Sequence, residues 1–190
     1  MKYSKTLIVI VGPEKQPFTV HHNIICKRSG FFTAAAAERS KTASSDPIML
    51  PEDEPAIFDA YLQCLYSNEV AHPTQEAPKN ATEPEGKAAE WETLCLTKQY
   101  ILADKLGDAE SCNLIMDALT EAVQTSAEIL GVVYEHSRSG SLLRKLFVHM
   151  HMYLVNHVEI AAHARSLPHE FLAELLSLRM LASSSRRAKG

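Results

Sequence analysis

Histidine is the residue type in this sequence best suited to metal binding or to acid and base catalysis. The chain has nine histidines, and His149, His151, His157 and His163 are of most interest among those late in the chain. On a helix His149 and His151 point about 200° apart, and His149 and His157 lie about two turns apart, so neither pair chelates one ion. We interpret these residues as surface and boundary histidines and predict no metal site. A metal- or ligand-binding enzyme that uses them stays open as an alternative.

No second catalytic pattern accompanies the histidines. The sequence contains no Gly-x-Gly-x-x-Gly, no Gly-Lys-Ser/Thr phosphate loop, no Gly-x-Ser-x-Gly and no His-Glu-x-x-His. Its cysteines lie far apart in apolar segments and form no Cys-x-x-Cys pair, which favours buried thiols at Cys26, Cys64, Cys95 and Cys112. We therefore predict no catalytic residue and no cofactor.

Composition sets the outer bounds on function. The 190 residues are 46% hydrophobic and carry a net charge of -4, which suits a globular protein of about one domain with an appendage. Nucleic-acid binding is not expected, because it needs concentrated lysine and arginine and only residues 186–189 are locally basic. No apolar run approaches the roughly 20 residues of a membrane span or forms the core of a signal peptide. We expect no membrane contact and an intracellular protein, in the cytoplasm, the nucleus or both.

The first half of the chain has the pattern of a hairpin followed by short helices. Apolar residues alternate in strands at 6–12 and 18–20, with a turn at 13–17 between them. Paired apolar residues then favour helices at about 23–28 and from Phe31 through the alanines. A polar connection at 39–47 leads to a short strand at 48–50 and to a helix at 55–66.

The second half is predicted to be helical after a long insertion. Residues 71–90 contain no large apolar side chain, so we predict a disordered insertion there. A helix from Trp91 ends near Gly107, and Asp108 caps the next helix by accepting its first amide hydrogens. A capping box at 125–128 opens an extension with further helices from Leu142 and Pro168. The predicted divisions are a domain at 6–124, a helical extension at 125–182 and a flexible tail at 183–190.

Several short motifs occur in the order found in the BTB/POZ domain, which this sequence resembles. They include Phe18-x-Val20-His21, Ser29-x-Phe31-Phe32, Leu50-Pro51-Glu52-Asp53-Glu54, Leu65-Tyr66-Ser67-Asn68-Glu69 and Ala103-Asp104-Lys105-Leu106. The resemblance implies an α+β fold, a small mixed sheet flanked by helices, with a structural signature at Phe18, His21, Ser29, Phe31, Phe32, Leu50, Tyr66 and Asp104. Residues 125–181 resemble the helical extension of small BTB-only proteins common in fungi.

The resemblance implies a non-catalytic protein–protein interaction module that acts as a scaffold or adaptor. As an alternative, the fold often serves as the substrate adaptor of a cullin-type ubiquitin ligase. Such adaptors usually carry a hydrophobic-x-Glu motif after the alanine-rich helix, where Ser40, Lys41 and Thr42 stand in this sequence. These three residues are the candidate interaction segment. Because the alanines beside them bury little surface, we expect the anchor for a cullin to be missing.

Self-association is expected to be weak. Many BTB domains exchange an N-terminal helix and strand, but only residues 1–5 precede the first predicted strand here. The transcription-factor members also use an Asp just before that strand, where Lys5 and Thr6 stand. Residues 7–11 form a long apolar strand, and an unpaired edge of this kind tends to be covered. We expect a monomer or a weak dimer made through helical faces, and no exchanged dimer.

Overall fold

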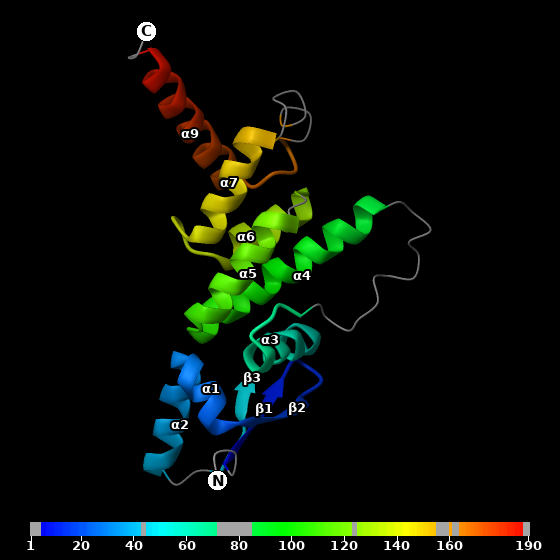
Figure 1. Ribbon diagram of the computed structural model, residues 1–190, viewed down its shortest axis with the longest axis vertical. Helices are drawn as coiled ribbons and strands as arrows, with labels where there is room; N and C mark the ends of the chain where they lie inside the picture. The colour runs from blue at the N-terminus through cyan, green and yellow to red at the C-terminus, as the bar shows by residue number, and fades with distance from the viewer. Residues whose placement is uncertain are drawn as a thin grey trace. The chain divides into compact units, whose positions relative to one another are not determined.

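The computed structural model describes residues 5–42, 45–71, 85–122, 125–154, 160 and 164–187, and Figure 1 labels its elements. The chain divides into two compact units, Met1–Ala122 and Val123–Gly190. We call them the N-terminal unit and the C-terminal unit.

A three-stranded sheet lies at one side of the N-terminal unit. Strands β1 (Thr6–Val11) and β2 (Gln16–His21) are antiparallel, and β3 (Ile48–Leu50) runs parallel to β1, which gives the order β2-β1-β3. Alternation along β1 buries Leu7, Val9 and Val11 on the side that faces the helices. The predicted hairpin is confirmed. The expectation that β1 has an unpaired edge is wrong for Val9–Val11, because these residues pair with β3 on the second side of β1.

The hairpin turn depends on one glycine. Gly12 has φ +76°, in the left-handed region that side chains rarely adopt. A Cβ atom at this position would also lie 3.0 Å from Cγ of Pro55, the first residue of α3 (Pro55–Ser67). The turn and the close approach of α3 therefore both require glycine here.

The helices of the N-terminal unit pack in two pairs, with α3 beside the second pair. Helix α1 (His22–Arg28) packs against α2 (Gly30–Thr42), and α4 (Glu85–Leu106) forms a hairpin with α5 (Ala109–Ala122), with α3 against α4 (Figure 1). Asn68 caps the end of helix α3, and its φ of 61° fits the tolerance of Asn for the left-handed region. The predicted α+β class is confirmed. Fully buried residues include Val9, Val20, Ile25, Phe32, Phe58, Tyr61, Leu106 and Ile115.

Two segments of this unit are more helical than the sequence predicts. The connection expected from residue 39 begins later, because α2 continues to Thr42, where the basic Arg39 and Lys41 suit the negative end of a helix. The insertion expected to reach residue 90 ends earlier, because α4 begins at Glu85. Residues 87–90 are strong helix formers, so local propensity extends the helix although no large apolar side chain is present. The rest of that insertion, residues 72–84, lies outside the described residues.

The C-terminal unit is helical. Its described helices are α6 (Ala127–His136), α7 (Leu142–Leu154) and α9 (His169–Arg187), and α7 packs against both of the others. The ring of His151 on α7 lies 4.7 Å from the ring of Phe171 on α9. Fully buried residues of this unit include Ile129, Leu130, Val133, Leu143, Phe147 and Phe171.

The ends of two helices in the C-terminal unit differ from the prediction. Ser126, not Thr125, caps α6: its hydroxyl accepts a hydrogen bond from the amide of Ile129 at 3.3 Å, and no Glu or Gln occupies that third position. The predicted capping box is therefore a simple serine cap. Helix α9 also continues to Arg187, through most of the tail predicted to be flexible, and the hydroxyls of Ser183 and Ser184 bond to carbonyls three residues back.

Candidate interaction surface

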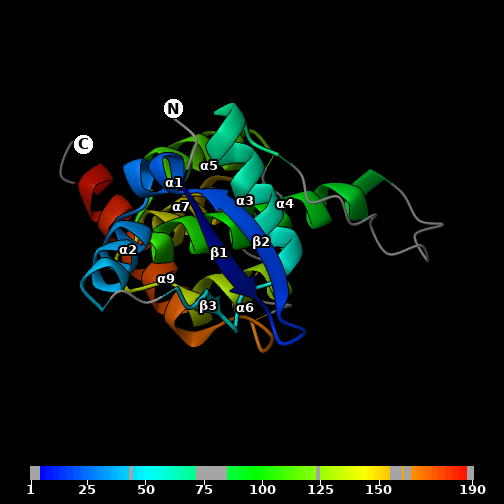
Figure 2. The same ribbon diagram turned by 90° about the horizontal axis from the view of Figure 1, so that it is seen from below.

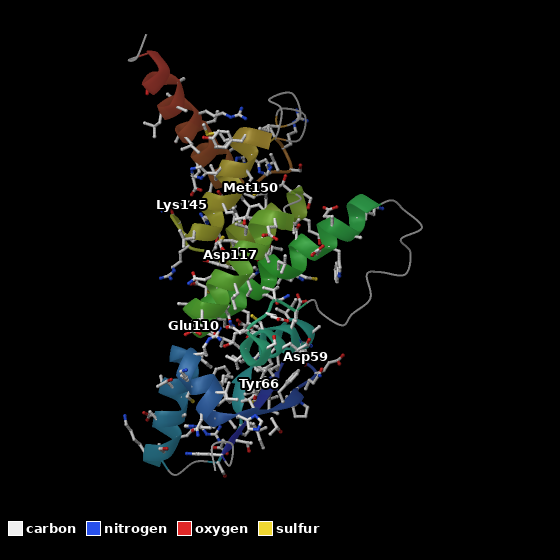
Figure 3. All side chains as sticks on the ribbon, in the orientation of Figure 1. Asp59, Tyr66, Glu110, Asp117, Lys145 and Met150 are labelled. Carbon is white, nitrogen blue, oxygen red and sulfur yellow. The ribbon has the colours of Figure 1, made fainter. Side chains whose placement is uncertain are left out.

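His21 and Tyr66 meet from the end of β2 and the last turn of α3. The backbone amide of His21 donates to the Tyr66 hydroxyl at 3.0 Å, and His21 Nδ1 lies 3.0 Å from the same oxygen. The two rings stand edge to face, 5.8 Å apart. Tyr66 is 45% exposed and is labelled in Figure 3. The pair links the strand to α3 and leaves part of the Tyr66 ring at the surface.

The other predicted signature residues of the first half lie in or beside the core. Phe18 stands edge-on to Phe58, with ring centroids 5.0 Å apart, while Phe32 and Leu50 are buried. Phe31 remains partly exposed and contacts Phe32. These residues connect the sheet to the helices around it.

Ser29 joins the start of α2 to the end of α4. Its buried hydroxyl donates to the carbonyl of Leu106 at 2.6 Å and accepts from the amide of Phe32 at 3.2 Å. A small hydroxyl side chain is needed here because it both caps α2 and contacts a backbone 77 residues away in sequence.

Asp108 forms the buried polar centre of the N-terminal unit. Its Oδ1 accepts from Nε of Arg28 at 3.1 Å and from the amide of Ser111 at 3.0 Å. Its Oδ2 accepts from the Tyr61 hydroxyl at 3.2 Å and from the Ser111 hydroxyl at 2.8 Å. Burial and the neighbouring Asp108 carboxylate both raise the pKa of Tyr61. This network joins α1, α3 and α5, and it satisfies a carboxylate with no exposed surface.

Asp104, the last residue of the predicted signature, lies exposed near the end of α4. The amide of Gly107 donates to its carbonyl at 3.0 Å, a contact made by the backbone. The buried carboxylate of this turn therefore belongs to Asp108, four residues after Asp104.

Ser40, Lys41 and Thr42 are exposed on the last turn of α2. Lys41 lies 3.5 Å from Glu38, and the Thr42 hydroxyl donates to the carbonyl of Glu38 at 3.1 Å. The candidate interaction segment is thus helical and polar, and it presents no large apolar side chain.

A groove of about 520 Å³ opens between the β1–β2 turn and the first turn of α3. Its lining includes Glu14, Glu52 and Asp59. Two further acids of the lining are paired with α4: Lys105 contacts Asp53 at 2.8 Å, and Lys98 contacts Glu54 at 2.6 Å. These two acids hold the β3–α3 connection against α4, which is a structural role.

Cys64 and Cys95 are buried as predicted, whereas Cys26 and Cys112 are only half-buried. All four are free. Burial raises the pKa of Cys95 to about 11 and that of Cys112 to about 12, and it also raises the pKa of Cys26 and of Cys64. A thiol with a raised pKa holds little thiolate at neutral pH, so none of the four is an activated nucleophile.

His149 and His151 lie in different surroundings on α7. His149 is exposed, but His151 is buried, so the interpretation as a surface or boundary histidine is wrong for His151. His157 and His163 lie outside the described residues. Among the residues that the structure describes, no three His, Cys, Asp or Glu side chains gather to hold a metal ion.

Burial of His151 makes the C-terminal unit sensitive to pH. Its Nδ1 donates to the carbonyl of Phe147 at 3.0 Å, and its ring stands 4.7 Å from the ring of Phe171. Desolvation lowers the pKa of His151 below its usual 6.5. The unfolded chain therefore takes up a proton as the pH falls below 6.5, while the folded unit does not until its lower pKa is reached.

We predict that the thermal midpoint of the C-terminal unit falls when the pH is lowered from about 7 to about 5.5, as measured by circular dichroism. The substitution His151→Gln should remove most of this fall. His149→Gln, at an exposed position of the same helix, is the control and should keep the fall. An equal fall in the His151→Gln variant would contradict the assignment.

The described helices include none that is both long and apolar enough to span a membrane. In a comparison with family models, residues 3–82 match the BTB/POZ domain. The chain contains a BTB/POZ domain. The matched region runs from β1 through α3 and includes the sheet, α1 and α2. No curated protein matches the sequence. BTB/POZ domains are non-catalytic protein–protein interaction modules and often dimerise.

Part of the polar centre of the N-terminal unit was not predicted from sequence. The cap at Asp108 was predicted, but its contacts with Arg28 and Tyr61 were not. Arg28 ends α1, where a basic residue is already explained by the helix dipole. Tyr61 lies on the apolar face of α3, so the sequence predicts only an aromatic residue of the core there. Arg28 and Asp108 are 80 residues apart in the sequence, so only the folded structure shows that they are partners.

Proposed function

We propose that this protein is a non-catalytic scaffold or adaptor whose N-terminal unit binds another protein. The observation that carries the proposal is the BTB/POZ domain at residues 3–82. The buried polar residues support a non-catalytic role, because Arg28 and Tyr61 both donate hydrogen bonds to Asp108 and so stabilise the fold. We place the protein in the cytoplasm, the nucleus or both, and its free cysteines support a reducing compartment.

Affinity purification of the full chain from cells, combined with metal analysis of the purified protein, tests this proposal. We expect at least one protein to be enriched in proportion to the bait, together with substoichiometric metal. A stoichiometric metal ion without any enriched protein would instead favour the metal- or ligand-binding enzyme that the histidines leave open.

We predict that the chain binds a cullin N-terminal domain with a dissociation constant weaker than about 1 µM, measured by calorimetry. The end of α2 supports this expectation, because Ser40 and Thr42 stand where cullin adaptors usually carry a hydrophobic residue and Glu. Sub-micromolar binding by the natural sequence would contradict it.

The double substitution Ser40→Leu and Thr42→Glu is the matched variant for this experiment. It restores a hydrophobic-x-Glu motif at exposed positions, so it should strengthen binding if this segment is the determinant. An unchanged affinity would mean that the contact lies elsewhere on the domain.

A further inference from the structure

The loop between α6 and α7 presents two serines on a tight turn at the surface of the C-terminal unit (Figure 1). The amide of Ser141 donates to the carbonyl of Arg138 at 3.1 Å, which closes the turn. Gly140 has φ +75°, and apart from its chain neighbours no described atom lies within 4 Å of the position that a Cβ would take. Arg138 and Ser139 are exposed, and Ser141 is half-buried. A large protein can therefore approach this turn.

The residues around Ser141 have the spacing that an arginine-directed protein kinase selects. Arg138 lies three residues before Ser141, and Leu142 follows it directly. Leu142 is a large apolar side chain that is nevertheless 62% exposed. Kinases of this kind bind an arginine at that distance through carboxylates and accept an apolar side chain after the acceptor hydroxyl. The loop is thus complementary in charge and in shape to such an active site.

The structure separates this match from the one other match in the sequence. Only Arg39 and Arg138 have a serine or threonine three residues later, and the residue after Arg39 is Thr42. Thr42 lies at the end of the continuous helix α2 (Figure 2), where its hydroxyl donates to the carbonyl of Glu38 at 3.1 Å. A kinase binds its substrate as an extended segment, so it would have to unwind this helix. The 137–141 loop can open without unwinding a helix.

We propose that Ser141 is a phosphorylation site for an arginine-directed protein kinase. The Ser141 oxygen forms a bond to the γ-phosphorus of a nucleoside triphosphate while the bond from that phosphorus to the β-phosphate oxygen breaks. The hydroxyl proton passes to the catalytic carboxylate of the kinase, and a nucleoside diphosphate leaves. The modification adds to the scaffold role and does not depend on it.

The start of α7 indicates what the phosphoryl group does. Its first turn contains no acidic residue, although negative charge is favoured there, and Arg144 and Lys145 follow instead. The Ser141 hydroxyl accepts a hydrogen bond from the Arg144 amide at 3.2 Å. A phosphoryl group on this oxygen brings a charge of about -2 to the free amides of the first turn. Lys145, labelled in Figure 3, is exposed about one helical turn after Ser141 and can pair with that charge.

Phosphorylation of the full chain in vitro tests the proposal. The probe is the catalytic domain of a calcium/calmodulin-dependent protein kinase with ATP and magnesium, and peptide mass spectrometry locates the phosphoryl group. We expect modification of Ser141, with kcat/KM lowered at least about tenfold by Arg138→Ala and nearly unchanged by Lys145→Ala. Ser141→Asn should abolish the modification, because asparagine still caps a helix but has no hydroxyl. Circular dichroism shows that each variant has folded.

Hydrogen exchange of the modified chain tests the effect on α7. Amide exchange in α7 peptides should become at least about twofold slower on phosphorylation, because the added charge stabilises the helix start. Lys145→Ala should reduce this slowing, although it leaves the modification itself intact. Peptides from α5, in the other unit, are the control and should exchange at the same rate before and after the reaction.

Three results would overturn the assignment of Ser141. The first is a wild-type chain that takes up no phosphoryl group. The second is modification mainly at Ser139, or at Thr42 as readily as at Ser141, because the fold would then not select the site. The third is an unchanged kcat/KM in folded Arg138→Ala. Unchanged or faster exchange in phosphorylated α7 would overturn the stabilising effect on the helix.

Discussion

Replacing Asp108 with alanine is expected to lower the free energy of unfolding of the N-terminal unit by about 3 to 5 kcal/mol. The change removes a carboxylate with no exposed surface and leaves Arg28, whose side chain is only 9% exposed, as a buried charge without that partner. The Tyr61 hydroxyl also loses its acceptor. The exposed Glu110 carboxylate remains 3.1 Å from Arg28, but solvent weakens this contact.

Urea unfolding followed by Trp91 fluorescence measures this effect. Trp91 is the single tryptophan of the chain and lies on α4, so its signal reports the N-terminal unit. Asp117→Ala is the matched control, because Asp117 is exposed on α5 and should change stability by less than about 0.5 kcal/mol. Similar losses in both variants would mean that the network around Asp108 contributes little. Figure 3 labels Glu110 and Asp117 on this helix.

Replacing Arg144 with alanine is expected to destabilise the C-terminal unit by about 2 to 3 kcal/mol. Arg144 is 5% exposed, and its guanidinium donates to the carbonyls of Tyr134 at 2.9 Å and Ser137 at 2.7 Å. It also pairs with Glu170 and stacks 4.3 Å from the Tyr134 ring. The expected loss is smaller than for Asp108 because the Glu170 carboxylate is exposed and regains water when its partner is removed.

Hydrogen exchange measured on peptides from α6, α7 and α9 tests the role of Arg144. Exchange should become faster in all three helices of the Arg144→Ala variant and stay unchanged in the Lys145→Ala control, whose exposed side chain is labelled in Figure 3. Arg144→Lys should recover little protection, since lysine keeps the charge but lacks the planar fork. Full protection in Arg144→Lys would show that charge alone holds the unit together.

The sheet and most helices follow from local sequence. Alternation in residues 6–11 and the glycine at the turn specify the β1–β2 hairpin, and the apolar face of α3 specifies its burial. Helix ends were predicted less well. The start of α4 at Glu85 and the end of α9 at Arg187 depend on weak propensity in segments without large buried residues, so apolar periodicity carries no signal there.

The contacts of the candidate surface depend on distant residues and could not be predicted in the same way. Arg28 and Asp108 are separated by 80 residues, and each has a sufficient local explanation at a helix end. Asp53 and Glu54 also have a local explanation, because acidic residues are favoured at the start of a helix. Their partners, Lys105 for Asp53 and Lys98 for Glu54, come close only because α3 packs against α4. The resemblance to the BTB/POZ domain predicts the fold, but it does not predict which distant residues form these ion pairs.

The most direct test of the central claim is a quantitative affinity purification with variants that act on one unit each. Full-length wild type, Asp108→Ala and Arg144→Ala are compared as bait at equal concentration. We predict a protein partner that is retained by wild type and by Arg144→Ala and is lost with Asp108→Ala, because we propose that the N-terminal unit carries the contact. A partner lost only with Arg144→Ala, or retained equally by all three baits, would contradict binding through the N-terminal unit.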